Sequence, residues 1–172
     1  MTPIIYLMTT GGGTERSCTE TGGAAPNGAA KIDRYLQSLH LPGLEVNIVP
    51  LMEKNGSEMA GQDRTLILGI VRAMLKENAP IVITHCLETV IATGLYLERA
   101  LSDLRTPIIL TGAVSPWGLP GGDGLQNITE SLMAAQLVGP GVYIVVHGTC
   151  FPVKRVRQDR VRGRFVWADE LT

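Results

Sequence analysis

The sequence predicts an α/β fold in which a mostly parallel β-sheet lies between two layers of helices. Short apolar runs, typical of buried strands, alternate with longer segments of helical periodicity. Each helical segment is long enough to carry the chain across the sheet and back to a parallel strand. A chain of 172 residues has room for one such domain. We therefore expect a single three-layer α/β/α domain over residues 1–172.

The apolar runs fix the order of the elements. They predict strands at Pro3–Met8, Leu44–Leu51, Pro80–Thr84, Pro107–Thr111 and Gly141–His147. Apolar residues at helical spacing predict helices at Ala29–Leu39, Gly61–Glu77, Thr89–Leu101 and Asn127–Leu137. We expect Glu88 or Thr89 to cap the third helix and Asp123 to cap the fourth, because their side chains could accept the free amide hydrogens there. This alternation indicates a flavodoxin- or Rossmann-like sheet.

Two segments stand apart from these elements. Gly11–Gly28 is glycine-rich and polar, and its length is typical of a lid or a binding loop. Lys154–Arg164 alternates basic residues with valine, which predicts a half-solvated strand, or a basic tail or edge segment within residues 154–172. Because charged runs usually stay in contact with water, we interpret this run as a solvated edge or an oligomer contact and not as a polyanion site.

Composition limits the partners and the compartment. The net charge is −1, and no basic cluster precedes the final segment, which argues against nucleic acid and anionic membranes as partners. The cysteines Cys18, Cys86 and Cys150 are too few and too widely spaced for a disulfide framework. We find no signal peptide and no apolar run of membrane-spanning length, so we expect a cytoplasmic protein. No ligand spacing matches a standard metal site, and we expect neither metal nor cofactor.

Small polar residues gather where the predicted strands end. They follow four strands, at Thr9 and Thr10, Asn55–Glu58, Thr84–Glu88 and Thr111–Ser115. The carboxyl ends of parallel strands meet at one edge of the sheet, where ligands bind in open α/β folds. Helix N-termini at the same edge favour anionic groups. The sequence therefore predicts a pocket there, with hydroxyls and a carboxylate, for a small anionic molecule.

Several of these residues stand in a recognisable order of motifs. The motifs are Thr10-Gly11-Gly12, Ser57-Glu58-Met59, Thr84-His85-Cys86-Leu87-Glu88-Thr89, Gly112-Ala113, and Asp123-Gly124 with Asn127. In this order and spacing, the chain from about residue 3 to about residue 158 resembles the amino-terminal domain of the bacterial-type L-asparaginase family. That family hydrolyses a side-chain amide through a threonine that forms an acyl-enzyme, which water then opens.

The resemblance implies roles for individual residues. It implies an amidohydrolase for a small carboxylated amide, with Thr10 as the nucleophile and Glu88 as its charged partner. It also implies that Ser57, or Gly56 one register over, grips the substrate's carboxylate. The full set of substrate-binding residues that we expect is Gly11, Gly56, Ser57, Glu58, Thr84, His85 and Leu87.

The family's proton-relay triad of threonine, aspartate and lysine is altered here. Carried over residue by residue, its positions hold Leu87, Glu88 and Thr106. Leucine has no acid–base group, Thr106 supplies no cation, and glutamate moves the carboxylate by one methylene. Since a displacement of about 1 Å in an active site can cost on the order of a hundredfold in rate, the relay should not run unchanged. We expect a homo-oligomer, a dimer or a tetramer, to close the site.

Two other functions stay open. Cys86, alone or with Cys18, could carry out thiol chemistry in the same pocket, as an isomerase, racemase or lyase of a small acidic compound, or could be an inert buried thiol. The chain could also be a non-catalytic ligand-binding relative. A histidine beside a buried strand, such as His85, is more often a hydrogen-bonded core residue than a catalyst. We interpret His147 as structural and Trp117 as an oligomer contact.

Overall fold

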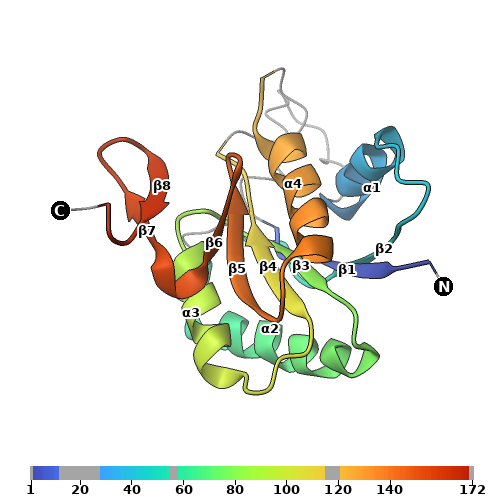
Figure 1. Cartoon of the computed structure of the whole chain (residues 1–172), viewed down its shortest axis with the longest axis horizontal. Helices are drawn as coiled ribbons and strands as arrows, with labels where there is room; N and C mark the ends of the chain where they lie inside the picture. Colours follow the sequence, from blue (N-terminus) through green and yellow to red (C-terminus); the bar gives the residue numbers. More distant parts are fainter. Residues whose placement is uncertain (1, 12–27, 55–57, 115–120, 171–172) are drawn as a thin grey trace.

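The protein is described by a computed structural model that covers residues 2–11, 28–54, 58–114 and 121–170. Its centre is a six-stranded sheet of order β2-β1-β3-β4-β5-β6, with helices on both faces (Figure 1). The strands are β1 Ile4–Thr9, β2 Glu45–Pro50, β3 Ile81–Thr84, β4 Pro107–Thr111, β5 Gly141–Val146 and β6 Thr149–Pro152. The helices are α1 Gly28–Ser38, α2 Gly61–Met74, α3 Val90–Ala100 and α4 Gly124–Leu137. The predicted α/β fold class is confirmed.

Strands β1 to β5 are parallel and form the order 2-1-3-4-5, while β6 pairs antiparallel with β5. This is the flavodoxin-like order, and its strand sequence reverses direction between β1 and β3. Thr9 of β1 lies opposite Thr84 of β3 in the register. The switch point of this topology therefore lies at Thr9, Thr10 and Thr84, which are buried.

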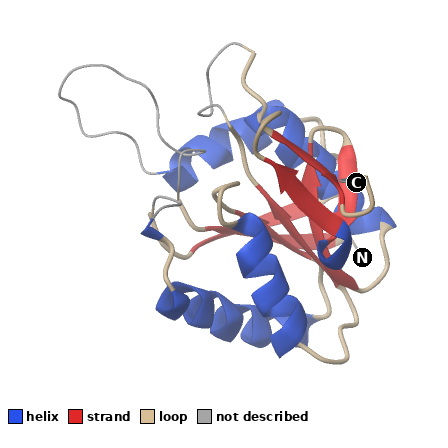
Figure 2. Cartoon of the chain, turned by 90° about the vertical axis from the view of Figure 1, so that its left-hand side faces the viewer, coloured by secondary structure: helices blue, strands red, loops and turns tan. Residues whose placement is uncertain are grey.

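The sheet is buried on both faces, which explains why its strands are continuous apolar runs. In β3, Ile81 and Ile83 belong to the core on the side of α2 and α3, whereas Val82 belongs to the core on the side of α1 and α4. Figure 2, turned by 90°, shows helices on either side of the sheet. Alternation within an apolar run thus joins two separate cores to one sheet.

The chain after β5 differs most from the predicted elements. His147 and Gly148 both have positive φ, the conformation of a type I′ hairpin turn, and they lead into β6. A short 3₁₀ turn, η3 Val153–Arg155, then leads to an antiparallel ribbon of β7 Val156–Asp159 and β8 Arg164–Trp167. This ribbon projects beside α3 (Figure 1). The half-solvated strand expected in the basic run is thus β7, while β6 and β8 were not predicted.

Aromatic contacts hold the ribbon to the sheet. The rings of Phe151 in β6 and Trp167 in β8 pack edge to face with centroids 4.8 Å apart. The Arg155 guanidinium lies 5.2 Å from the centroid of the Trp167 ring. Since a two-stranded ribbon is marginally stable alone, these contacts explain how it keeps its place.

The helix starts differ in detail from the expected caps. The second predicted helix ends at Met74 and continues as the 3₁₀ turn η2 Leu75–Glu77. Thr89 and Asp123 do occupy the N-cap positions of α3 and α4, but neither side chain makes a capping hydrogen bond. The Asp123 carboxylate instead accepts the backbone N–H of Val114, because α4 begins at Gly124 and turns that carboxylate toward the end of β4.

Candidate functional site

Thr10 and Thr84 meet at the carboxyl ends of β1 and β3. The Thr10 hydroxyl donates to the carbonyl oxygen of Thr84 over 2.8 Å, and Thr10 has no exposed surface. This bond joins the two strands at the point where the topology opens its crevice. A hydroxyl that donates to a carbonyl keeps its oxygen lone pairs for another partner. Thr10 therefore stands in a defined orientation at the predicted edge.

Gly11 brings the segment after β2 close to Thr10. Its φ is +76°, and a Cβ there would lie 2.5 Å from the backbone nitrogen of Lys54, so only glycine fits. That nitrogen donates to the Thr10 carbonyl over 3.1 Å. The Lys54 ammonium also pairs with the Asp63 carboxylate at the start of α2, at 2.7 Å. The backbone of Thr10 and Gly11 is thus fixed against residues 51–54.

His85, the next residue after β3, lies inside the protein. It has no exposed surface, and both ring nitrogens are bonded: Nδ1 to the carbonyl oxygen of Cys86 at 2.9 Å and Nε2 to the Thr93 hydroxyl at 2.9 Å. A carbonyl can only accept, so Nδ1 carries the proton and Nε2 accepts from Thr93. The Thr93 oxygen in turn accepts from Nε of Arg64 over 3.2 Å.

Burial sets the charge of this histidine. Desolvation, with a smaller contribution from the Arg64 charge, lowers the pKa of His85 to about 4, against the hydrogen bond to Cys86, which raises it. His85 is therefore neutral near pH 7. Its environment is that of the hydrogen-bonded core residue considered from the sequence, and its side chain presents nothing to a ligand in this conformation.

The turn after β3 is packed tightly against the end of β4. A Cβ on Gly112 would lie 2.1 Å from the His85 carbonyl oxygen, so glycine is required there as well. Leu87 is 6% exposed and belongs to the core on the side of α2 and α3. Its side chain supplies packing where the family resemblance places a triad threonine.

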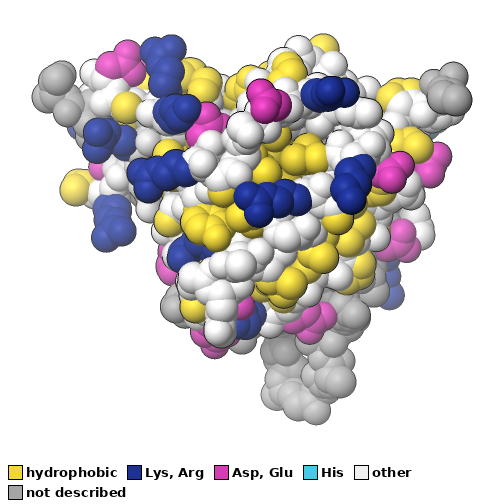
Figure 3. Space-filling view, turned by 90° about the horizontal axis from the view of Figure 1, so that it is seen from below, with side chains coloured by type: hydrophobic (Ala, Val, Ile, Leu, Met, Phe, Trp, Pro, Cys, Tyr) yellow, Lys and Arg dark blue, Asp and Glu magenta, His cyan; other side chains and the backbone are white. Residues whose placement is uncertain are grey.

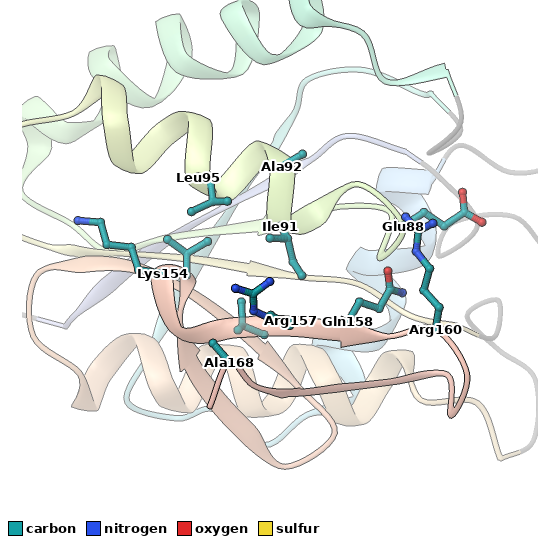
Figure 4. A pocket seen from close by; sticks show the side chains of 11 residues that line it. Glu88, Ile91, Ala92, Leu95, Lys154, Arg157, Gln158, Arg160 and Ala168 are labelled. Atoms are coloured by element: carbon teal, nitrogen blue, oxygen red, sulfur yellow. The ribbon is translucent and has the colours of Figure 1, made fainter. Parts of the chain in front are cut away.

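Glu88 has the opposite environment to that of His85. It is exposed and lines an open groove of about 610 Å³ between α3 and β7 (Figure 4). The other described residues that line the groove are Ile91, Ala92, Leu95, Val153, Lys154, Val156, Arg157, Gln158, Arg160 and Ala168. Glu88, Gln158 and Arg160 also border an adjoining hollow of about 380 Å³. Thr10 and Cys86 are not among the described residues that line either hollow.

Thr106, the residue at the family's lysine position, lies far from the carboxyl edge of the sheet. Thr106 precedes β4, whose carboxyl end is Thr111, the register partner of Thr84. At about 3.3 Å per residue, Thr106 lies roughly 16 Å from that edge, at the opposite end of the sheet. The residues that face Glu88 across the groove come instead from β7 and the turn after it, namely Gln158 and Arg160. The period-two pattern of the basic run was the one signal in the sequence that pointed to them.

The other half of the carboxyl edge is a hydrogen-bonded network, which we call the Asp123 network: Asp123, Asn127 and His147. Nε2 of His147 contacts the Asp123 carboxylate at 2.8 Å. The buried Asn127 amide donates to the Gly112 carbonyl oxygen over 2.8 Å and to Asp123 over 3.1 Å, and it accepts the N–H of His147 over 2.9 Å. These bonds tie the loop after β4 to the turn after β5.

The remaining candidates have varied placements. Gly56, Ser57, Cys18 and Trp117 lie outside the described residues. Glu58 is exposed before α2, and Cys86 is half-buried. Burial raises the pKa of the Cys150 thiol. Within residues 2–11, 28–54, 58–114 and 121–170, no three histidine, cysteine or acidic side chains gather as they would around a metal ion, and no helix has the length and apolarity needed to cross a membrane.

Known proteins share this fold. A solved structure of the thermostable L-asparaginase from Thermococcus kodakarensis superposes with a TM-score of 0.86 at 24% identity, over 95% of this chain and 51% of that one. L-asparaginase I from Vibrio cholerae gives 0.79 at 21% identity, over 96% and 51%. The probable cytoplasmic L-asparaginase from Campylobacter jejuni gives 0.75 at 17% identity, over 91% and 48%. At these identities the likeness shows the fold alone.

The sequence comparisons add the family. The L-asparaginase of Thermococcus kodakarensis is 25% identical over 140 residues, which are 81% of this chain and 43% of that protein. This chain thus spans about half the length of the relatives that it matches. The family described as "Asparaginase, N-terminal" matches residues 4–164, nearly the whole described fold. With the parallel sheet and the two threonines at its switch point already in place, that match makes this chain a member of the asparaginase family, corresponding to its amino-terminal domain.

Proposed function

We propose that the protein is an amidohydrolase that releases ammonia from a small carboxylated amide, with Thr10 as nucleophile and an altered proton relay. The observation that carries the proposal is the 2.8 Å bond from the Thr10 hydroxyl to the Thr84 carbonyl at the switch point of the sheet. It holds a hydroxyl at the place where open α/β sheets bind ligands. Membership of the asparaginase family supports the choice of an amide as substrate.

In the proposed reaction, the Thr10 oxygen bonds to the amide carbon while the C–N bond breaks, and the hydroxyl proton leaves with the nitrogen as ammonia. Water then hydrolyses the ester and restores the hydroxyl. Thr10 has no exposed surface in the described conformation, so the reaction includes a step in which the hydroxyl is uncovered. Apo geometry of this kind does not argue against a catalytic residue, because catalytic contacts often tighten only on binding.

The altered relay depends on Glu88 in this proposal. Leu87 can transfer no proton, and Thr106 lies at the other end of the sheet. The exposed Glu88 carboxylate is the titratable group that the turn after β3 presents to solvent. Gly11, the Gly56–Glu58 segment and the Thr84–Leu87 segment would hold the substrate around it, and a dimer or tetramer of the chain would close the site. Localisation in the cytoplasm remains a prediction.

The test is ammonia release from asparagine and glutamine by the full chain. We expect Thr10→Ala to lower kcat by a factor of about 10³ or more, because removal of a nucleophile leaves only residual catalysis. Glu88→Gln should lower kcat less, by about 10². The matched control is Thr129→Ala: this exposed threonine bonds only to its own helix among the described contacts, and the variant should keep full activity.

Other outcomes would replace the proposal. If Thr10→Ala keeps its activity and alkylation of Cys86 abolishes it, the thiol chemistry considered from the sequence is correct instead. If no amide is hydrolysed while a small acid binds tightly, the protein is a ligand-binding relative. Circular dichroism of each variant separates loss of chemistry from loss of folding.

A further inference from the structure

The basic residues of Lys154–Arg164 divide into paired and unpaired side chains. Lys154 pairs with Glu98 at 2.6 Å, Arg155 with Asp169 at 3.6 Å, and Arg162 with Asp159 at 3.3 Å. Within the described part of the chain, Arg157, Arg160 and Arg164 form no ion pair. Of these three, Arg157 and Arg160 line the groove beside α3. The groove thus contains two cations that form no ion pair with a described carboxylate.

The charges have an order along the groove. Glu88, itself without an ion pair among the described residues, stands at one end with Arg160, Arg157 lies further along, and Lys154 marks the other end (Figure 4). Ile91 and Leu95 of α3 and Val153 before β7 form apolar walls. A ligand that fits this order has an ammonium group near Glu88 and a carboxylate further along, with an aliphatic part between them.

The dimensions favour a ligand longer than one amino acid. The groove volume of about 610 Å³ lies in the range of sites that hold drug-sized molecules. Arg157 and Arg160 are three residues apart, so their backbones are roughly 10 Å apart at strand spacing. An extended tripeptide has about that length.

A second hollow lined by basic residues serves as a comparison, because one of its cations has a structural partner. Seen from below, the molecule presents lysine and arginine side chains among apolar ones (Figure 3). A hollow of about 390 Å³ at the amino end of the sheet is lined by Arg72, Lys76 and Arg105. Arg72 donates to the Ala100 carbonyl at the end of α3 over 3.0 Å, so this cation stabilises a helix C-terminus. Arg157 and Arg160, in the groove beside α3, form no such hydrogen bond within the described part of the chain.

We infer that the groove between α3 and β7 binds the acidic arm of a peptide-like substrate, whose amino-terminal residue carries the amide and whose second carboxylate is held by Arg157. The inference rests on the proposed function, since it names the substrate class of that site. It predicts that the protein prefers an amide residue at the start of an acidic peptide to free asparagine.

The test compares two peptides by calorimetric titration into the Thr10→Ala chain, which binds without turnover: Asn-Ala-Glu-amide and Asn-Ala-Gln-amide. They differ by one carboxylate. We expect the acidic peptide to bind about tenfold more tightly, and Arg157→Gln to weaken it about fivefold while the neutral peptide is unaffected. Arg164→Gln, from the same basic run but outside the groove, is the matched control and should change neither affinity. If Thr10→Ala does not fold, wild type is titrated with the corresponding Asp-peptides.

Several results would overturn the inference. Equal affinity for the two peptides would mean that the groove does not recognise the second carboxylate. An equal loss in Arg164→Gln shows a general field effect and no site. Loss of self-association in Arg157→Gln by sedimentation, without peptide binding, makes the groove an interface between copies of the chain. Peptide binding is measured without hydrolysis, so the two proposals are tested separately. If the groove does not bind the acidic arm, ammonia release from asparagine is still observed. If the protein is not an amidohydrolase, the ammonia assay alone reveals it.

Discussion

Two polar clusters of the molecule, the Asp123 network and the charged residues of the groove between α3 and β7, differ in whether their groups have partners within the protein. In the Asp123 network, the Asn127 side chain and the Asp123 carboxylate are bonded to the backbone and to each other. In the groove beside α3, Glu88, Arg157 and Arg160 form no ion pair within the described part of the chain. A buried polar group needs a hydrogen-bond partner inside the protein, whereas an exposed charge in a hollow remains available to a ligand. The Asp123 network therefore has a structural role, and the groove beside α3 is the candidate site for ligand recognition.

The largest expected effect comes from breaking the scaffold. Asn127→Leu leaves the Gly112 carbonyl and the His147 N–H without their partners, so we expect the free energy of unfolding to fall by about 3 kcal/mol. Urea denaturation measures this. Gln126→Ala, at an exposed position one residue earlier, should stay within about 0.5 kcal/mol of wild type. A loss below about 1 kcal/mol in Asn127→Leu would mean that this half of the edge is not rigid.

The second prediction concerns His85, which is buried and neutral, in contrast to the exposed charges of the groove. Its pKa is lowered to about 4 in the folded protein from an ordinary 6.5, so the unfolded chain binds one more proton between these values. Stability is therefore fully present above pH 6.5 and falls as the pH drops toward 4. Between pH 7 and pH 5 this amounts to about 2 kcal/mol.

Urea denaturation at both pH values measures this loss. Replacement of His85 by glutamine should remove the pH-dependent part whatever the stability of the variant at pH 7. Replacement of the exposed His40 by glutamine should leave the pH-dependent part in place. If the wild type were equally stable at both pH values, His85 would not be held neutral by its burial.

The same two clusters show how far the sequence predicts this molecule. The strands β1, β3 and β4 were predictable because both faces of the sheet are buried, which leaves continuous apolar runs. The exposure of Glu88 was not, since the period-two rule stops where β3 ends at Thr84. The buried, hydrogen-bonded environment of His85 is the one that its place beside a buried strand favoured. In β7, alternation of Arg and Val indicated a half-solvated strand but not its neighbour, because pairing with β8 and the contact of Trp167 with Phe151 are set by distant residues. Thr106 was expected at the start of the fourth strand, and it directly precedes β4.

The smallest expected effect concerns Thr106 and sharpens the comparison. The Thr106 hydroxyl is buried and has no hydrogen-bond partner among the described residues, whereas the polar groups of the Asp123 network are bonded. Thr106→Val removes the unsatisfied group at nearly constant shape, so we expect a gain of about 1 kcal/mol in the free energy of unfolding. Thr106→Ser, which keeps the hydroxyl, should give no gain. Ammonia release and peptide affinity should be unchanged in Thr106→Val, because the residue lies at the opposite end of the sheet from Thr10 and Glu88. A loss of activity in this variant, with stability increased, would place Thr106 in the proton relay. It would also show that a buried hydroxyl without a partner can be functional in this protein.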